Sequence, residues 1–363
     1  MKKSNKCPVF FPKAAEIRQF PMNTPPILSQ EELGCAMQKL RALAAAMNQV
    51  LFGQKDLIEL VLIGVLARGH ILLEGLPGLG KTELVKGLSR ALDITARRVQ
   101  FTPDLLPGDI TGTPVLQERD GTKNFIFQEG PVFANIMLAD EINRASPKTQ
   151  SALLEAMEER QVTVDGTTYP LQKPFAVIAT QNNVGTAGTQ LLPYAQMDRF
   201  LVRLSIGYPD YEAQMSILRD RQSTDPIGSV AQVVTRDDVL RMQAEVRAVT
   251  AKDSILDYIT RLAMASREHP MVEVGISPRG TLFLDRMAKA HAYLEGRDYV
   301  TGGDVQAVFH DVCTHRVILN QKSRLSGGTV TQVLNELLET VEVPDRRHCL
   351  LYTSPSPRDP KTS

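Results

Sequence analysis

Residues 75–82, Gly-Leu-Pro-Gly-Leu-Gly-Lys-Thr, have the residue types and spacing of a phosphate-binding loop. They follow an apolar run at 71–73 and precede a helix-forming segment at 83–92. Glycines let backbone N–H groups close around phosphate oxygens, and the N-terminus of the helix adds a favourable dipole. Lys81 can reach the β- and γ-phosphates, and the Thr82 hydroxyl can ligate Mg²⁺. The sequence therefore predicts that a nucleoside triphosphate is bound by Gly75, Pro77, Gly78, Leu79, Gly80, Lys81, Thr82 and Glu83.

Two carboxylates follow the apolar run 136–139 about sixty residues after this loop. In parallel α/β sheets, ligands bind where the strands end, so Asp140 is expected to hold Mg²⁺ and Glu141 to orient or deprotonate the attacking water. The next apolar run, 175–180, leads to Asn182. Its amide can hydrogen-bond the γ-phosphate or the water beside Glu141, although a turn-capping asparagine explains the spacing equally well.

Two arginines are further candidates. Arg199 lies in Asp-Arg-Phe, and hydrolysis of a nucleoside triphosphate gains from an arginine on the transferring phosphoryl group, often supplied by a neighbouring molecule. Arg279 lies in Ser-Pro-Arg at the start of a predicted helix, from which it could reach back over the nucleotide. From the residues alone, a surface salt bridge for Arg199 and a solvated helix start for Arg279 are the simpler explanations.

The elements that position these residues follow from the hydrophobic pattern. Five apolar runs, separated by helical segments, predict a parallel sheet covered on both faces, that is, an α/β fold. They lie at 71–73, 98–102, 136–139, 175–180 and 200–206. Two helices precede the sheet, at 29–47 and 55–67; the first is either a flank for the nucleotide base or an ordinary covering helix.

Two alternating segments with Asp-Gly turns, 112–127 and 161–171, predict β-hairpins. A nucleotide fold does not need them, so they either touch another molecule or cap an edge of the sheet.

The chain divides into four parts. Residues 1–28 form a proline-containing flexible extension, 29–210 the nucleotide-binding domain, 211–344 a small all-helical domain, and 345–363 a disordered tail. Residues 349–363 look like the translation of a sequencing adapter, so they are treated as a non-native artefact that replaces the native C-terminus. Met22 offers an alternative start.

Composition excludes several classes of protein. The 41 basic and 41 acidic residues balance, which gives no overall sign of binding to nucleic acid or an anionic membrane. Four scattered cysteines favour a reducing compartment and form neither a zinc motif nor a disulfide framework. The longest apolar stretch, near 57–67, is too short to span a bilayer. A cytoplasmic location is expected.

Several ordered blocks of the sequence closely resemble the MoxR branch of the AAA+ ATPases, and the similarity extends from about 50 to 344. These blocks lie at 69–82, 138–145, 150–164, 179–182, 195–200 and 277–279. The resemblance implies a five-stranded AAA+ core with a helical lid, working with ATP and Mg²⁺ as a ring, usually a hexamer. Lys81 and Thr82 then match Walker A, and Asp140 and Glu141 match Walker B.

By the same resemblance, Asn182 matches sensor 1, Arg199 the arginine finger that acts in trans, and Arg279 sensor 2. The hairpins match the helix-2 insert and the pre-sensor-1 hairpin, which face the pore or the client in such rings. Family members resemble chaperones that mature or activate partner proteins, often metal- or cofactor-dependent, together with a von Willebrand factor A domain protein. The loop 183–193 departs from the family pattern, so its contact with a neighbour or client is expected to differ.

The sequence thus predicts an ATP-driven ring that remodels a client protein. The alternative is an AAA+ nucleic-acid motor of the helicase type, which the neutral charge and the scarcity of Lys and Arg in the hairpins disfavour. A monomeric P-loop kinase is the third possibility, and it is disfavoured by the predicted lid.

Overall fold

A five-stranded parallel sheet with the strand order β2–β5–β8–β1–β9 lies at the centre of the computed structural model, which describes residues 29–76, 78–119, 122–181, 192–220, 228 and 230–344. Its strands are β1 (Ile71–Glu74), β2 (Ala96–Gln100), β5 (Ile136–Asp140), β8 (Ala176–Gln181) and β9 (Val202–Ser205). The five predicted strands are confirmed, with ends that differ by up to two residues. Strands β1 and β8 are buried along their whole length, as expected for a sheet covered on both faces.

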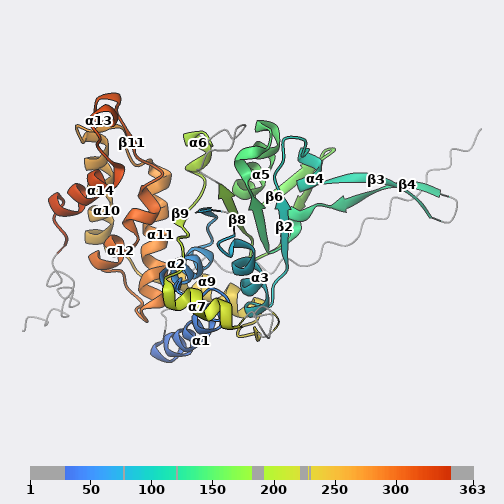
Figure 1. The fold of residues 1–363 in the computed structure, drawn as a ribbon, viewed down its shortest axis with the longest axis horizontal. Helices are drawn as coiled ribbons and strands as arrows, with labels where there is room; N and C mark the ends of the chain where they lie inside the picture. The colour runs from blue at the N-terminus through green and yellow to red at the C-terminus, as the bar shows by residue number, and fades with distance from the viewer. Residues whose placement is uncertain are drawn as a thin grey trace, which may run out of the picture.

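Alternate residues of the strands enter two separate cores. Ile71 and Leu73 pack in the core that contains α1 (Gln30–Asn48), α2 (Lys55–Leu66) and α3 (Lys81–Ala91). Leu72 faces the second core, which lies under α5 (Pro147–Glu159). Short helices complete this side of the molecule, namely α4 (Pro107–Thr111), α6 (Tyr194–Met197), η1 (Pro131–Phe133) and η2 (Ile142–Arg144). The fold is therefore a three-layered α/β arrangement, with the sheet in the middle (Figure 1).

Both predicted hairpins are present. The first pairs β3 (Gly112–Arg119) with β4 (Thr122–Glu129) and extends away from the body of the molecule (Figure 1). The second pairs β6 (Gln161–Val164) with β7 (Thr167–Pro170). The two hairpins meet where the rings of Phe127 and Tyr169 stack at 4.0 Å between centroids.

The C-terminal half is mainly helical, as predicted. Its helices from 253 onward gather at the end of the molecule opposite the first hairpin, whereas those at 211–220 and 236–248 lie beside α1 and α2 (Figure 1). Its helices are α7 (Tyr211–Asp220), α9 (Arg236–Ala248), α10 (Asp253–Glu268), α11 (Pro278–Leu294), α12 (Gly302–Cys313), α13 (Gln321–Leu325) and α14 (Val330–Thr340). The prediction that strands end at 211 needs one correction, because β10 (Val272–Val274) pairs with β11 (Ile318–Leu319). Segments of two or three residues are too short to show a period in the sequence. No described helix is long and apolar enough to cross a membrane.

A buried arginine fastens this helical region to the sheet. Arg316, just after α12, is fully buried, and its Nε lies 2.9 Å from Asp198 Oδ1. The same guanidinium donates to the carbonyl oxygens of Leu201 and Asp198, both at 3.2 Å. Ser277, the N-cap of α11, also donates to the Asp198 carboxylate at 3.0 Å. The start of α11 and the segment that follows α12 therefore both depend on one carboxylate next to Arg199.

We expect Arg316→Met to lower the free energy of unfolding by about 3–5 kcal/mol, because it leaves the Asp198 carboxylate and several carbonyl oxygens without their buried donor. Urea unfolding measures the change. The control is Arg324→Met, which removes an exposed arginine paired with Glu273 in the same helical region and is expected to cost at most about 0.5 kcal/mol. Equal effects of the two substitutions would contradict this account.

Candidate active site

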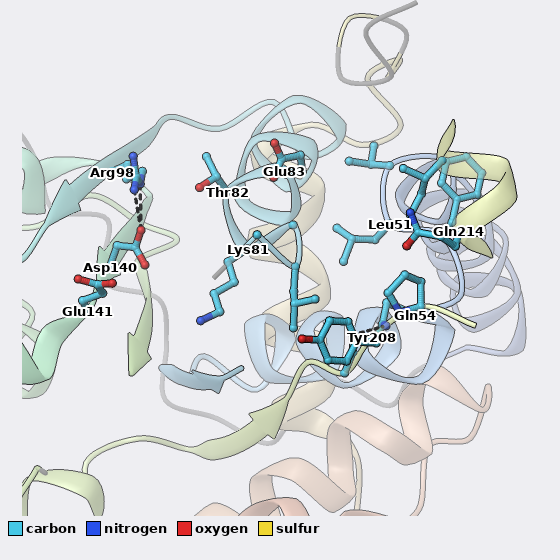
Figure 2. A pocket seen from close by; sticks show the side chains of 18 of the residues that line it. Leu51, Gln54, Lys81, Thr82, Glu83, Arg98, Asp140, Glu141, Tyr208 and Gln214 are labelled. Atoms are coloured by element: carbon cyan, nitrogen blue, oxygen red, sulfur yellow. Dashed lines mark hydrogen bonds and ion pairs between the residues drawn. The ribbon is translucent and has the colours of Figure 1, made fainter. Parts of the chain in front are cut away.

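A cavity of about 660 Å³ lies where the strands of the sheet end, a size typical of small-molecule sites. The phosphate-binding loop forms one wall, and the side chains that follow β5 form the opposite wall (Figure 2). The residues predicted for this site that do line the cavity are Gly78, Leu79, Gly80, Lys81, Thr82, Glu83, Asp140 and Glu141. Pro77 and Asn182, which were also predicted, lie outside the described residues.

Two glycines allow the loop to take this shape. Gly80 caps the N-terminus of α3 with φ 89°, a left-handed conformation that residues with a Cβ rarely adopt. A Cβ on Gly75 would lie 2.7 Å from the carbonyl oxygen of Ile206, so only glycine lets the start of the loop approach the end of β9. The loop is thus pressed against the sheet, and α3 points its N-terminus toward the cavity, where it favours an anion.

Lys81 extends from α3 into the cavity, between the loop and the two carboxylates (Figure 2). Its ammonium donates to the carbonyl oxygen of Gly75 at 2.6 Å. Burial lowers the pKa of Lys81, while the nearby carboxylates of Asp140, Glu141 and Glu74 oppose that shift. A cation that is desolvated and fixed at the mouth of the loop can bind phosphate oxygens with little reorganisation.

A single hydroxyl orients the two carboxylates. Thr180, on β8, donates to Asp140 Oδ1 at 2.6 Å and accepts from the backbone N–H of Glu141 at 2.8 Å. Glu141 itself has φ 55°, a conformation that costs a residue with a side chain about 1–3 kcal/mol. Because the chain turns sharply at this residue, both consecutive carboxylates line the same cavity.

Each carboxylate also has an arginine partner, and the sequence alone did not indicate either arginine. Arg98 Nη2, on β2, lies 2.7 Å from Asp140 Oδ2, and Arg144 Nη1 lies 2.7 Å from Glu141 Oε2. The pairing of Gln100 with Asp140 in neighbouring strands explains why Arg98 can reach across. Recognising this pair from sequence requires the strand order, which places β2 next to β5.

The donor set at this end of the sheet fits Mg²⁺. Thr82 and Asp140 contribute a hydroxyl and a carboxylate to one cavity, and Mg²⁺ prefers such hard oxygen ligands. When bound, Mg²⁺ would neutralise charge on the phosphate oxygens. The ion pair between Arg98 and Asp140 places a guanidinium group beside the carboxylate that would hold the metal.

The far end of the cavity is formed by residues to which sequence reasoning gave no role. They are Val50, Leu51, Phe52, Gln54, Gly207, Tyr208, Pro209, Gln214 and Ile217. Gln54 donates to the carbonyl oxygen of Gly207 at 3.1 Å and thereby joins the two segments. This end of the cavity is lined by the loop that follows α1 and by the start of α7, rather than by the helix expected at 29–47 (Figure 2).

Arg199 and Arg279 lie elsewhere. Both arginines pair with the carboxylate of Glu158 on α5, and the distance from Arg199 is 3.3 Å. They line a separate cavity of about 280 Å³. Neither lines the cavity at the phosphate-binding loop. In this structure Arg279 lies beside Glu158 rather than over the phosphate-binding loop of its own chain, because α11 begins beside the end of α5; its role at the nucleotide stays a prediction.

Comparisons with known proteins agree with this geometry. A model of the ATPase family associated with various cellular activities matches residues 70–202, and a model of the AAA lid domain matches residues 264–337. A crystal structure of a protein from Cytophaga hutchinsonii, assigned as an ATPase, has a TM-score of 0.82 and 40% sequence identity, covering 87% of this chain and 98% of that one. The fold is that of an AAA+ ATPase.

Two curated relatives narrow the family. The chain is 38% identical over 333 residues to Chaperone MoxR1 of Mycobacterium tuberculosis, covering 89% of this chain and 87% of the relative. It is 44% identical over 300 residues to YeaC of Bacillus subtilis, covering 83% of this chain and 93% of the relative. The chain belongs to the MoxR family of AAA+ ATPases.

Thr180→Val should lower the kcat of ATP hydrolysis by about ten- to a hundredfold and leave the KM for ATP nearly unchanged, because it removes the hydroxyl that orients both carboxylates but no group that faces the phosphates. Steady-state ATPase assays measure both constants. Thr180→Ser keeps the hydroxyl and is the matched control. A valine variant with the wild-type kcat would show that this hydroxyl does not position Glu141.

Proposed function

We propose that the chain works as a ring in which each ATP is hydrolysed between two subunits. One observation carries this proposal: Arg199 and Arg279 share Glu158 on a surface separate from the cavity of their own phosphate-binding loop. Two partly exposed guanidinium groups on one carboxylate retain a net positive charge that suits phosphate oxygens. A neighbouring subunit can present its phosphate-binding loop to this surface, and a hexamer is the expected ring.

Each site then contains residues from two adjacent subunits. Glu141 accepts the proton of the water that attacks the γ-phosphorus, while the bond to the β–γ bridging oxygen breaks. Lys81 neutralises charge on the phosphate oxygens, Thr82 and Asp140 hold Mg²⁺, and Asn182 positions the water. Arg199 of the adjacent subunit stabilises the charge that develops on the transferring group, and Arg279 acts from the same side.

We propose that hydrolysis drives the remodelling of a client protein through the first hairpin. Its described side chains include three exposed hydrophobic residues, Leu116, Phe125 and Ile126. Exposed apolar groups on an extended ribbon suit a protein surface better than a phosphate backbone. Maturation or metal and cofactor activation of that client, a von Willebrand factor A domain partner and a cytoplasmic location are proposed by analogy with the family.

We expect Arg199→Ala and Arg279→Ala each to lower ATPase activity at least about a hundredfold. Each variant should regain part of this activity when it is mixed with Glu141→Gln subunits. The reason is that a Glu141→Gln subunit still offers both arginines to its neighbour. ATPase assays on mixtures over a range of ratios measure the recovery.

The control mixture combines Lys81→Ala with Glu141→Gln, because both changes lie in the site formed by one chain's own loop and cannot complement each other. Absence of recovery for Arg279→Ala alone would show that this arginine acts in its own subunit. Analytical ultracentrifugation of the Glu141→Gln protein with Mg-ATP tests the assembly itself. A monomer under these conditions would contradict the ring.

A further inference from the structure

A third concave site lies between the core and the helical region, away from the phosphate-binding loop. It is a cavity of about 390 Å³ and shares no lining residue with the cavity at the phosphate-binding loop. The core contributes Arg68 from the end of α2 and Arg160 from the end of α5, and the helical region contributes Arg247, Arg286 and Lys289. The lining thus holds five basic side chains and one acidic side chain, Asp285.

The charges in this basic cavity are poorly compensated. Asp285 is already paired with Lys289 at 2.9 Å. Burial together with the charges of Arg160, Arg68 and Arg247 lowers the pKa of Arg286 to about 10. The pKa of Arg68 is lowered by burial and by Arg247, and that of Arg160 by burial and by Arg68. Cations that depress one another's pKa attract an anion.

Helix capping accounts for only part of this arrangement. Arg286 donates to the carbonyl oxygens of Ala67 and Arg68, and Arg160 donates to that of Arg68 at 2.8 Å, so both satisfy the C-terminal end of α2. Arg247 lies at the exposed rim of the cavity and adds a further positive charge without taking part in this capping.

The backbone at two of these positions favours a smaller residue. Arg68 has φ 58° and Arg160 has φ 54°, each just beyond the end of a helix where glycine is usual. The left-handed conformation is unfavourable for a residue that carries a Cβ. Two left-handed helix ends therefore both carry a guanidinium group into the same cavity. The unpartnered and buried Oδ1 of Asp285 adds an acceptor for a hydroxyl or a protonated oxygen.

From this geometry we propose that the basic cavity binds a compact polyanion of the phosphate-chain type. Guanidinium groups match phosphate oxygens with paired hydrogen bonds, and a phosphate chain brings several charges into a small volume. An acidic peptide would bring fewer charges for its size. The anion would bridge Arg68 and Arg160 of the core to Arg247 and Lys289 of the helical region, and so restrain one against the other.

The phosphate chain could belong to a free oligophosphate or to the nucleotide of a neighbouring subunit, because Arg68, Arg160 and Arg286 also line the adjoining cavity of Arg199 and Arg279. We assign the site to the free ligand. The test therefore uses full-length Lys81→Ala protein, whose phosphate-binding loop is disabled, at a concentration where ultracentrifugation shows single chains. Inorganic tripolyphosphate, with a chelator present, is titrated into it by calorimetry.

We expect one tripolyphosphate per chain and an affinity that falls steeply with salt. Adding Arg247→Gln and Lys289→Gln, which leave the helix-capping arginines intact, should raise the Kd at least about tenfold. The control adds Arg261→Gln and Arg324→Gln instead, which remove the same charge from surface ion pairs on α10 and α13. It should leave the Kd unchanged.

Three results would overturn the proposal: no binding by single chains, equal loss of affinity in both double variants, or displacement of tripolyphosphate by a poly-glutamate peptide at equal concentration. If single chains do not bind tripolyphosphate, the nucleotide of a neighbouring subunit becomes the better candidate ligand for this cavity. None of them depends on the subunit-mixing result, so failure here and failure of the ring are distinguishable.

Discussion

The hydrogen bond from the Thr180 hydroxyl to Asp140 is the interaction on which the site depends. It joins the ends of β8 and β5, so the edge of the sheet and the pair of carboxylates become one unit. The same oxygen accepts from the N–H of Glu141, whose left-handed conformation needs such support. A neighbouring strand thus fixes the backbone turn that directs the Glu141 carboxylate into the cavity, and the buried interior of the sheet makes the turn rigid.

The sequence predicts the sheet and the phosphate-binding loop well because their signals are local. Continuous apolar runs, the Gly80 turn and the capping box of Ser29 and Glu32 each act within a few residues. The pairs of Arg98 with Asp140 and of Arg279 with Glu158 could not be predicted in this way. They depend on strand order and on where α11 begins, and those are set by packing over more than a hundred residues.

The cavity at the phosphate-binding loop and the surface beside the end of α5 differ in their balance of charge. Near the loop, Lys81 faces carboxylates from two strands, which gives a balanced site ready for phosphates and metal together. Beside the end of α5, one carboxylate, Glu158, faces Arg199 and Arg279, and the adjoining cavity adds more arginines. A surface with surplus positive charge and a site that binds an anion complement each other only when two copies meet. Repetition of that contact from one copy to the next closes a ring when the rotation permits.

The contacts that anchor the helical region would couple it to the phosphate contacts of Arg199 in such a ring. Asp198 receives Arg316 and Ser277 and directly precedes Arg199, so the guanidinium that would touch a neighbour's phosphate lies one peptide unit from the joint between the core and the helices. Arg316 is fully buried, and its ion pair is costly to open, so this joint transmits displacement rather than absorbing it. In the proposed ring, a change in phosphate contacts at Arg199 would therefore act directly on the joint that holds α11 and α12 to the core. In that proposed arrangement, the loss of one phosphate in a neighbouring subunit would be felt at this joint.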